Sequence, residues 1–217
     1  MEKTNITISL DLHDFSILRN RFDLLTVLKE HYPDMKVSLF TIPYDYSLEM
    51  SDMLRIGKAE ALRRIEENKD WLEFIPHGLT HFPREFEKAD RDTMIAYVNN
   101  VIPEMVKTGF PEERIVKGFC APMWLWNQDV IDVLDESGWW GAIDRNQPDM
   151  LRPKRYYTYT HSIDEPYWLS NQSLIKLHGH MSKPSPNNLE DCLLKLLKMP
   201  MKAEWKFVSE LVGGDSL

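Results

Sequence analysis

The sequence predicts an α/β fold in which helices cover a parallel β-sheet. Short apolar or β-branched runs alternate with amphipathic helical stretches along most of the chain. Polar residues suited to catalysis or metal binding follow several of these apolar runs. The alternation is typical of parallel sheets, because a helix usually connects one parallel strand to the next. By itself it allows either an open doubly wound sheet or a barrel.

The first half of the chain contains three predicted strands, each followed by a predicted helix. Each strand is a short apolar run, and each helix has apolar residues three or four positions apart. The strands are expected at Ile6–Leu10, Lys36–Thr41 and Leu72–Ile75, and the helices at Ser16–Glu30, Met53–Asn68 and about Arg91–Lys107.

The second half of the chain continues the alternation of strands and helices as far as Ile143, and the pattern then becomes less regular. A strand is expected at Ile115–Phe119, a helix at Asp129–Ser137 and a strand at Trp140–Ile143. The region Leu151–Ser173 is rich in tyrosine, proline and polar residues and contains one strand, "RYYTYT". The last elements are a strand "SLIKLH", a helix at Asn188–Lys198 and a candidate closing strand "WKFVSELV".

Composition narrows the class of protein. A chain of 217 residues with 43% hydrophobic residues can bury one full core, so we expect a single domain over residues 1–217. The net charge of -8 disfavours nucleic acid as a partner. The start has no basic region followed by an apolar stretch, and no run of about 18 apolar residues occurs. We therefore expect a cytoplasmic protein without a membrane partner.

Chemically versatile residues cluster after the predicted strands. In parallel α/β folds the carboxyl ends of the strands meet at one edge, where catalytic groups collect. The residues at these positions are Asp11, His13 and Asp14, then His77 and His81, Cys120, Asp144, and finally His178 and His180. One at a time they have ordinary explanations, such as a helix N-cap for Asp14 or a hydrogen-bonded turn for the histidines. Their common location favours a shared site, and two imidazoles four positions apart can bind one metal ion.

Five short stretches occur in chain order between about Ile6 and His180: "SLDLHD", "HGLTH", "CAPMW", "WWGAID" and "LHGH". They resemble the motifs of the polysaccharide deacetylase family, also called the NodB-homology domain or carbohydrate esterase family 4. The resemblance implies a distorted (β/α) barrel with about seven parallel strands. It also implies a metal-dependent hydrolase that removes an N-acetyl or related acyl group from a sugar or small glycan amide.

The resemblance and the chemistry of the residue types together suggest a metal site. Asp14, His77 and His81 would bind a divalent ion, which would activate water and polarise the amide carbonyl. Zinc is the first choice for two imidazoles and a carboxylate, with Co²⁺, Mn²⁺ or Ni²⁺ as alternatives.

Further roles follow for the remaining residues. Asp11 would be the general base, and His178 the acid that protonates the leaving amine, with Asp144 keeping that imidazole charged. Trp124, Trp126 and His180 are expected to bind the substrate, a small molecule or glycan.

Departures from the family pattern leave alternatives open. The acids of the first motif are adjacent in the family, whereas Leu12 and His13 separate Asp11 from Asp14, so either His13 or Asp14 is the third ligand. Cys120 stands where the family has an arginine that orients the base, so either another group holds Asp11 or activity is weak. Two other functions remain open: a non-catalytic carbohydrate-binding barrel, and a hydrolase of non-sugar C–N bonds.

Overall fold

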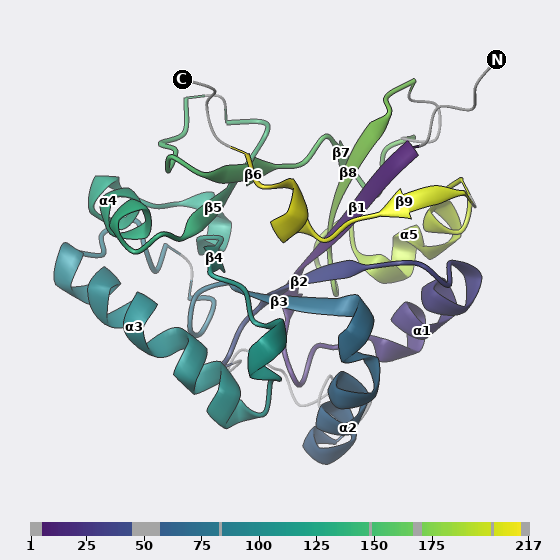
Figure 1. Cartoon of the computed structure of the whole chain (residues 1–217), viewed down its shortest axis with the longest axis horizontal. Coiled ribbons are helices and arrows are strands. Elements are labelled where there is room, and N and C mark those ends of the chain that lie inside the picture. The colour runs from purple at the N-terminus through teal and green to yellow at the C-terminus, as the bar shows by residue number, and fades with distance from the viewer. Residues whose placement is uncertain are drawn as a thin grey trace.

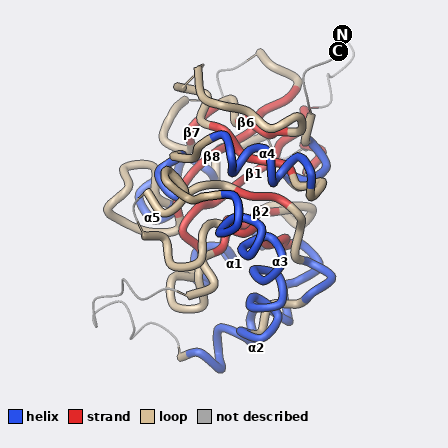
Figure 2. The backbone as a smooth tube through the Cα atoms, turned by 90° about the vertical axis from the view of Figure 1, so that its left-hand side faces the viewer, coloured by secondary structure: helices blue, strands red, loops and turns tan. Residues whose placement is uncertain are grey.

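The structure is a computed structural model that describes residues 6–44, 57–82, 84–147, 149–166, 171–200 and 202–213. Figure 1 shows the helices around the outside of the strands, and Figure 2 shows the same arrangement from the side. The helices are α1 Phe22–His31, α2 Lys58–Asn68, α3 Arg91–Thr108, α4 Gln128–Glu136 and α5 Leu189–Leu196. The strands are β1 Ile6–Phe15, β2 Val37–Thr41, β3 Leu72–Pro76, β4 Gly118–Phe119, β5 Trp140–Ile143, β6 Tyr156–Thr158, β7 His161–Ser162, β8 Leu174–His180 and β9 Ala203–Trp205.

The strands form two parallel sheets that follow one another around a distorted barrel. The larger sheet has the order β3-β2-β1-β8-β7, with β9 also paired to β1, and the smaller has the order β4-β5-β6. A parallel bridge between Phe74 and Ile115 links the β3 side of the first sheet to the chain just before β4. The predicted α/β fold with a parallel sheet is confirmed. A continuously hydrogen-bonded ring is not found among the described strands.

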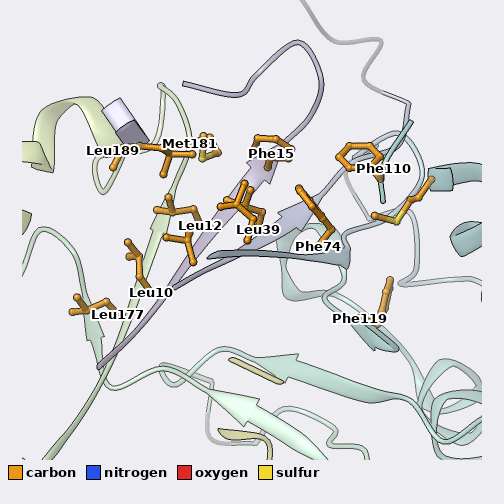
Figure 3. Packing of buried hydrophobic residues seen from close by; sticks show 14 of the residues in the cluster. Leu10, Leu12, Phe15, Leu39, Phe74, Phe110, Phe119, Leu177, Met181 and Leu189 are labelled. Carbon is orange, nitrogen blue, oxygen red and sulfur yellow. The ribbon is translucent and has the colours of Figure 1, made fainter. Parts of the chain in front are cut away.

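Strand alternation separates an apolar outer layer from a mixed inner one. Leu10 and Leu12 of β1, Leu39 of β2, Phe74 of β3 and Leu177 of β8 pack in the large core beneath the helices (Figure 3). Full burial of such a side chain contributes about 1.5–3 kcal/mol relative to exposure. Successive strand residues face opposite sides, so the intervening residues point into the barrel.

The inner layer combines a small apolar cluster with polar groups. The cluster includes Phe40, Ile75, Trp140, Tyr157 and Tyr159, and none of its buried members comes from α1 to α5. Buried polar side chains lie on the same strands, at Ser9, Asp11, His13, Ser38, Glu73 and His178. Because these groups have lost water, each needs a partner inside the barrel.

Most predicted elements occur near their expected positions. The first strand, however, continues to Phe15 instead of ending at Leu10, and of the strand predicted at Ile115–Phe119 only Gly118–Phe119 forms. Two further elements differ. The first helix begins at Phe22 rather than Ser16, because the Ser16 hydroxyl accepts from the backbone N–H groups of Leu18 and Arg19 in a turn. The closing strand "WKFVSELV" is wrong: β9 ends at Trp205, and Val208–Leu211 forms a 3₁₀ turn. The backbone N–H of Val208 there donates to the Ser38 hydroxyl inside the barrel.

Part of the predicted helix at Met53–Asn68 lies outside the described residues, and its described part is α2. Within the described ranges, no helix is both long and apolar enough to cross a bilayer.

Candidate active site

The paired strands β1 and β8 bring four polar side chains together inside the barrel. Asp11 lies opposite His178 in the parallel register, and His13 lies opposite His180. Partners on neighbouring strands face the same side of a sheet. A pairing across more than 160 residues of sequence therefore creates the centre of the site.

Asp14 reaches the site through an irregularity at the end of β1. Simple alternation would direct residue 14 outward, beside Leu12. Instead Asp14 has a left-handed φ of 61°, and the register with β2 shifts between Leu12 and Phe15. The Asp14 Oδ1 atom then lies 3.0 Å from Nε2 of His81 and 3.5 Å from Nε2 of His77. The bulge brings Asp14 to both histidines of "HGLTH", while Phe15 returns to the outer core.

Asp14, His77 and His81 fit a divalent cation. Their candidate ligand atoms all lie within 4.8 Å of one another. The Asp14 Oδ1 atom is buried yet accepts no hydrogen bond of acceptable geometry. The His77 Nδ1–H donates to the backbone carbonyl of Cys120 at 2.9 Å, which leaves Nε2 free to bind a metal. One carboxylate and two imidazoles are a typical set for zinc with open coordination positions.

The loop between the two histidines depends on Gly78 and Glu85. Gly78 has a φ of +71°, and a Cβ there would lie 2.7 Å from Oε2 of Glu85 and 2.9 Å from Cγ of Pro122. The Glu85 Oε1 atom accepts from the backbone N–H of Leu79 at 3.2 Å. The Glu85 carboxylate thus occupies the space that a larger residue at position 78 would need. This explains a glycine where the family motif has serine or threonine.

Asp11 is held by three side chains, in the absence of the family's arginine. Its Oδ2 accepts from Nδ1 of His178 at 2.8 Å, and its Oδ1 accepts from the Tyr157 hydroxyl at 3.0 Å. The Nε2 atom of His13 lies 3.4 Å from Oδ2. Burial disfavours the charged form of Asp11, but His178 and His13 outweigh it and lower the pKa to about 2. Asp11 is therefore an anion at neutral pH.

Cys120 adds no charge to this group. The thiol is fully buried, and burial together with nearby carboxylates raises its pKa well above the usual range. It remains a neutral thiol near the backbone carbonyl of Ala121.

Asp144 lies near enough to His178 for an electrostatic interaction, but its hydrogen bonds are to other groups. Asp144 accepts hydrogen bonds from the Tyr159 hydroxyl at 2.7 Å and from the backbone N–H of Asn146 at 2.9 Å. The Tyr159 ring stacks on His178, with centroids 4.5 Å apart. The carboxylate bonded to His178 is Asp11, because these two are register partners, whereas Asp144 follows β5 in the other sheet.

The predicted substrate-binding residues lie in different places. Trp124 is half-buried, with its ring 5.0 Å from His13 and 5.5 Å from His178. Nδ1 of His180 hydrogen bonds with the Asn187 side-chain oxygen at 2.8 Å. Trp126 belongs to the outer core: its ring stacks on Phe119 and it is 8% exposed. This burial gives no support to its predicted role in substrate binding.

Sequence reasoning missed Tyr157, Tyr159 and Glu85, and left His13 only as an alternative ligand. The two tyrosines alternate in the predicted strand "RYYTYT", so a shared face could have been inferred. Glu85 had no such signal, because its role depends on the fold of the preceding loop.

Comparison with known proteins gives similarity at the level of structure only. No family model matches the chain, and no curated protein matches it. The chitin deacetylase of the fungal pathogen Colletotrichum lindemuthianum is 14% identical with a TM-score of 0.58, over 97% of this chain and 88% of that one. The chain has the fold of the family 4 carbohydrate esterases.

Two further solved structures agree with that fold. The family 4 domain of a multidomain xylanase from the hindgut metagenome of Trinervitermes trinervoides is 11% identical with a TM-score of 0.55, over 95% of this chain and 89% of that one. A family 4 pseudoenzyme from Bacillus anthracis is 14% identical with a TM-score of 0.56, over 95% of this chain and 65% of that one. The esterase fold thus occurs in catalysts and in at least one pseudoenzyme.

Proposed function

We propose that this protein is a divalent-metal-dependent hydrolase that removes an N-acetyl or related acyl group from a sugar or small glycan amide. One observation supports the proposal above all. The metal-binding set Asp14, His77 and His81 lies next to the buried Asp11–His178 pair, since the His13 ring contacts both His77 and His178 at centroid distances of 4.8 and 4.5 Å.

Asp14, His77 and His81 are the residues that would bind the ion. A divalent ion there would polarise the amide carbonyl and increase the acidity of the attacking water. Zinc suits the donors best, and Co²⁺, Mn²⁺ or Ni²⁺ are alternatives.

The residues of the chain supply the proton transfers. In this proposal Asp11 accepts a proton from the attacking water, and His178 donates one to the departing amine. The Asp11 carboxylate fixes the orientation of His178, because it accepts a hydrogen bond from Nδ1 at 2.8 Å. The Tyr159 ring stacks on a face of the same imidazole and holds it in place.

Trp124 provides a surface for the substrate. Its half-buried ring lies beside His13 and His178, where an apolar sugar face can stack on it. A small-molecule or glycan partner is consistent with this placement.

One observation favours a second candidate, a non-catalytic carbohydrate-binding barrel. A carboxylate with a pKa of about 2 is a weak base, and Cys120 cannot supply the charge of the family's arginine.

The first experiment is metal analysis by mass spectrometry of wild type and of the double variant His77→Ala/His81→Ala. We expect about one first-row metal ion per chain in wild type after reconstitution with limiting metal, and none bound tightly in the variant. A wild-type protein that folds but binds no such ion tightly contradicts the metal-dependent proposal.

The second experiment measures release of acetate from a panel of N-acetyl sugars with Zn²⁺, Co²⁺, Mn²⁺ or Ni²⁺ supplied. Turnover that Asp11→Asn abolishes, with sugar binding retained, excludes the binding-only function. Sugar binding without turnover supports it. A panel of cyclic amides and ureides tests the third function: turnover of these compounds, and not of N-acetyl sugars, would indicate a hydrolase of non-sugar C–N bonds.

A further inference from the structure

The barrel contains a second group with the same donor types as the first. We name the two by depth: the outer cluster is Asp14, His77 and His81, and the inner cluster is Asp11, His13 and His178. Each consists of one carboxylate and two imidazoles, and in each the candidate ligand atoms lie within 4.8 Å of one another. The members of the inner cluster are at most 4% exposed.

Each cluster contains a buried polar atom without a hydrogen-bond partner, which favours binding of a cation. Four buried side-chain atoms in the described part of the chain lack a hydrogen-bond partner, namely His13 Nε2, Asp14 Oδ1, Glu85 Oε2 and Thr158 Oγ1. The first belongs to the inner cluster and the second to the outer one. Leaving a buried polar atom without a partner is costly, about 1–3 kcal/mol, so a ligand that satisfies it is favoured.

The inner cluster has nearly the spacing that a metal ion needs. The Asp11 Oδ2 atom lies 2.8 Å from Nδ1 of His178 and 3.4 Å from Nε2 of His13. Metal bonds of about 2.0–2.2 Å in tetrahedral geometry separate ligand atoms by about 3.3–3.5 Å. The Asp11–His13 pair already has such a separation, and the Asp11–His178 pair reaches it if the contact opens by about half an ångström.

Tyr157 leaves the required oxygen available. Its hydroxyl donates to Oδ1 of Asp11, so Oδ2 is the oxygen that faces both imidazoles. Metal ions bind only unprotonated imidazole nitrogens, so an ion entering here replaces the proton on Nδ1 of His178 and releases it to solvent.

We infer that the inner cluster is a second divalent-cation site, weaker than the outer one, and that loading it inhibits the enzyme. The second ion binds more weakly because the charge of the first opposes it at short range. Imidazole-rich donors select first-row transition ions such as Zn²⁺ or Co²⁺ over Mg²⁺ or Ca²⁺. The inhibitory part rests on the proposed function, since a second ion would occupy Asp11 and His178, the proposed proton acceptor and donor.

The test counts ions rather than turnover. Metal-free protein is equilibrated by dialysis against rising concentrations of Zn²⁺, and bound zinc per chain is measured by mass spectrometry. We expect wild type to bind two ions in separate steps. His13→Phe retains a flat ring beside Phe40, Trp124 and His77 but has no donor, so only the tight ion is expected to bind.

Further variants assign each zinc-binding step to one of the two clusters. His77→Ala/His81→Ala is expected to lose the tight ion and keep the weaker one. His31→Ala, at the end of α1, is expected to behave as wild type and controls for chelation by surface histidines. If His13→Phe does not fold, Asp11→Asn keeps the shape of the side chain and removes the charge, and it is expected to weaken the second step at least 10-fold.

A wild-type protein that saturates at one ion overturns the inference, as does a folded His13→Phe protein that binds two. Activity gives a separate result. Turnover is expected to fall as the second ion loads in wild type and in His31→Ala, but not over the same zinc range in His13→Phe. Wild-type turnover that holds steady while the second ion loads overturns the inhibition. If no substrate is ever turned over, the proposed function fails, and the ion count still decides whether the second site exists.

Discussion

Asp11 and His178 are register partners on the adjacent parallel strands β1 and β8, and their side chains meet at 2.8 Å inside the barrel. Both side chains are at most 4% exposed, and such burial makes a hydrogen bond stronger than it is in water. Tyr157 binds the other oxygen of the same carboxylate. The Asp11 side chain thus has one orientation, set by residues from three strands.

Tyr157→Phe is expected to lower turnover about 10-fold while the protein remains folded. The change removes only the hydroxyl that orients Asp11, and a typical hydrogen bond contributes about 0.5–1.5 kcal/mol. The pH profile of turnover should shift as well, because Asp11 loses a donor that favours its anion. Tyr32→Phe is the matched control: its buried hydroxyl donates to backbone carbonyls of Leu196 and Met199, remote from the site. Equal turnover in wild type and Tyr157→Phe would refute this role.

Glu73→Gln is expected to stabilise the protein increasingly as the pH rises from about 4 toward neutrality. Burial raises the pKa of Glu73, only partly offset by hydrogen bonds from Ser209 and Ser38. Because the native pKa is raised, the wild-type carboxyl group contributes most to the free energy of unfolding below its unfolded pKa of about 4.3. That contribution is lost as the pH rises through the native pKa.

Urea denaturation of wild type and Glu73→Gln at several pH values measures this effect. The difference in free energy of unfolding should grow with pH and then level off above the native pKa. A constant difference across that range is incompatible with a raised pKa at Glu73. Glu87→Gln, at a partly exposed carboxylate paired with Arg84, is the surface control for the chemical change itself.

Gly78→Ala is expected to reduce metal affinity and stability, and the loss should be smaller in a Glu85→Ala background. The new methyl group collides with the Glu85 carboxylate and with Pro122, and a φ of +71° adds strain in both backgrounds. A double-mutant cycle cancels the shared terms and isolates the contact with Glu85. Zinc affinity by calorimetry and thermal unfolding are the measurements. Additive losses would show that Glu85 does not restrict position 78.

Trp124→Ala and Trp126→Ala are expected to fail in different ways. Trp126 is in the outer core, so its loss should cost about 3–5 kcal/mol of unfolding free energy, as is typical of large core truncations. Trp124 is half-buried at the site, so its loss should weaken substrate binding and raise KM with little change in stability. Denaturant unfolding and steady-state kinetics separate the two. Comparable stability losses in both variants would contradict the placement of Trp124.

The local sequence pattern predicts a helix or strand correctly where the limits of that element depend on one segment of the chain alone. The strand Trp140–Ile143 was predicted with its observed limits, because a short apolar run between a helix and a polar turn has few alternatives. The helix from Arg91 was found as well, with Asp90 capping its start and Gly109 ending it. The first helix was placed too early because apolar spacing cannot reveal a turn closed by the Ser16 hydroxyl.

The sequence by itself determined the alternation of strands and helices, and showed that Asp11, Asp14, His77, His81 and His178 lie in or soon after three of the strands. These follow from hydrophobic periodicity, which is local along the chain. Only the tertiary structure decided which of them meet. The bulge at Asp14 brings its carboxylate to both His77 and His81, the β1–β8 register pairs His178 with Asp11, and Trp126 packs in the outer core. The physical reason is that a side chain's direction and partner depend on register, backbone dihedrals and packing between strands far apart in sequence, and a one-dimensional pattern does not encode these.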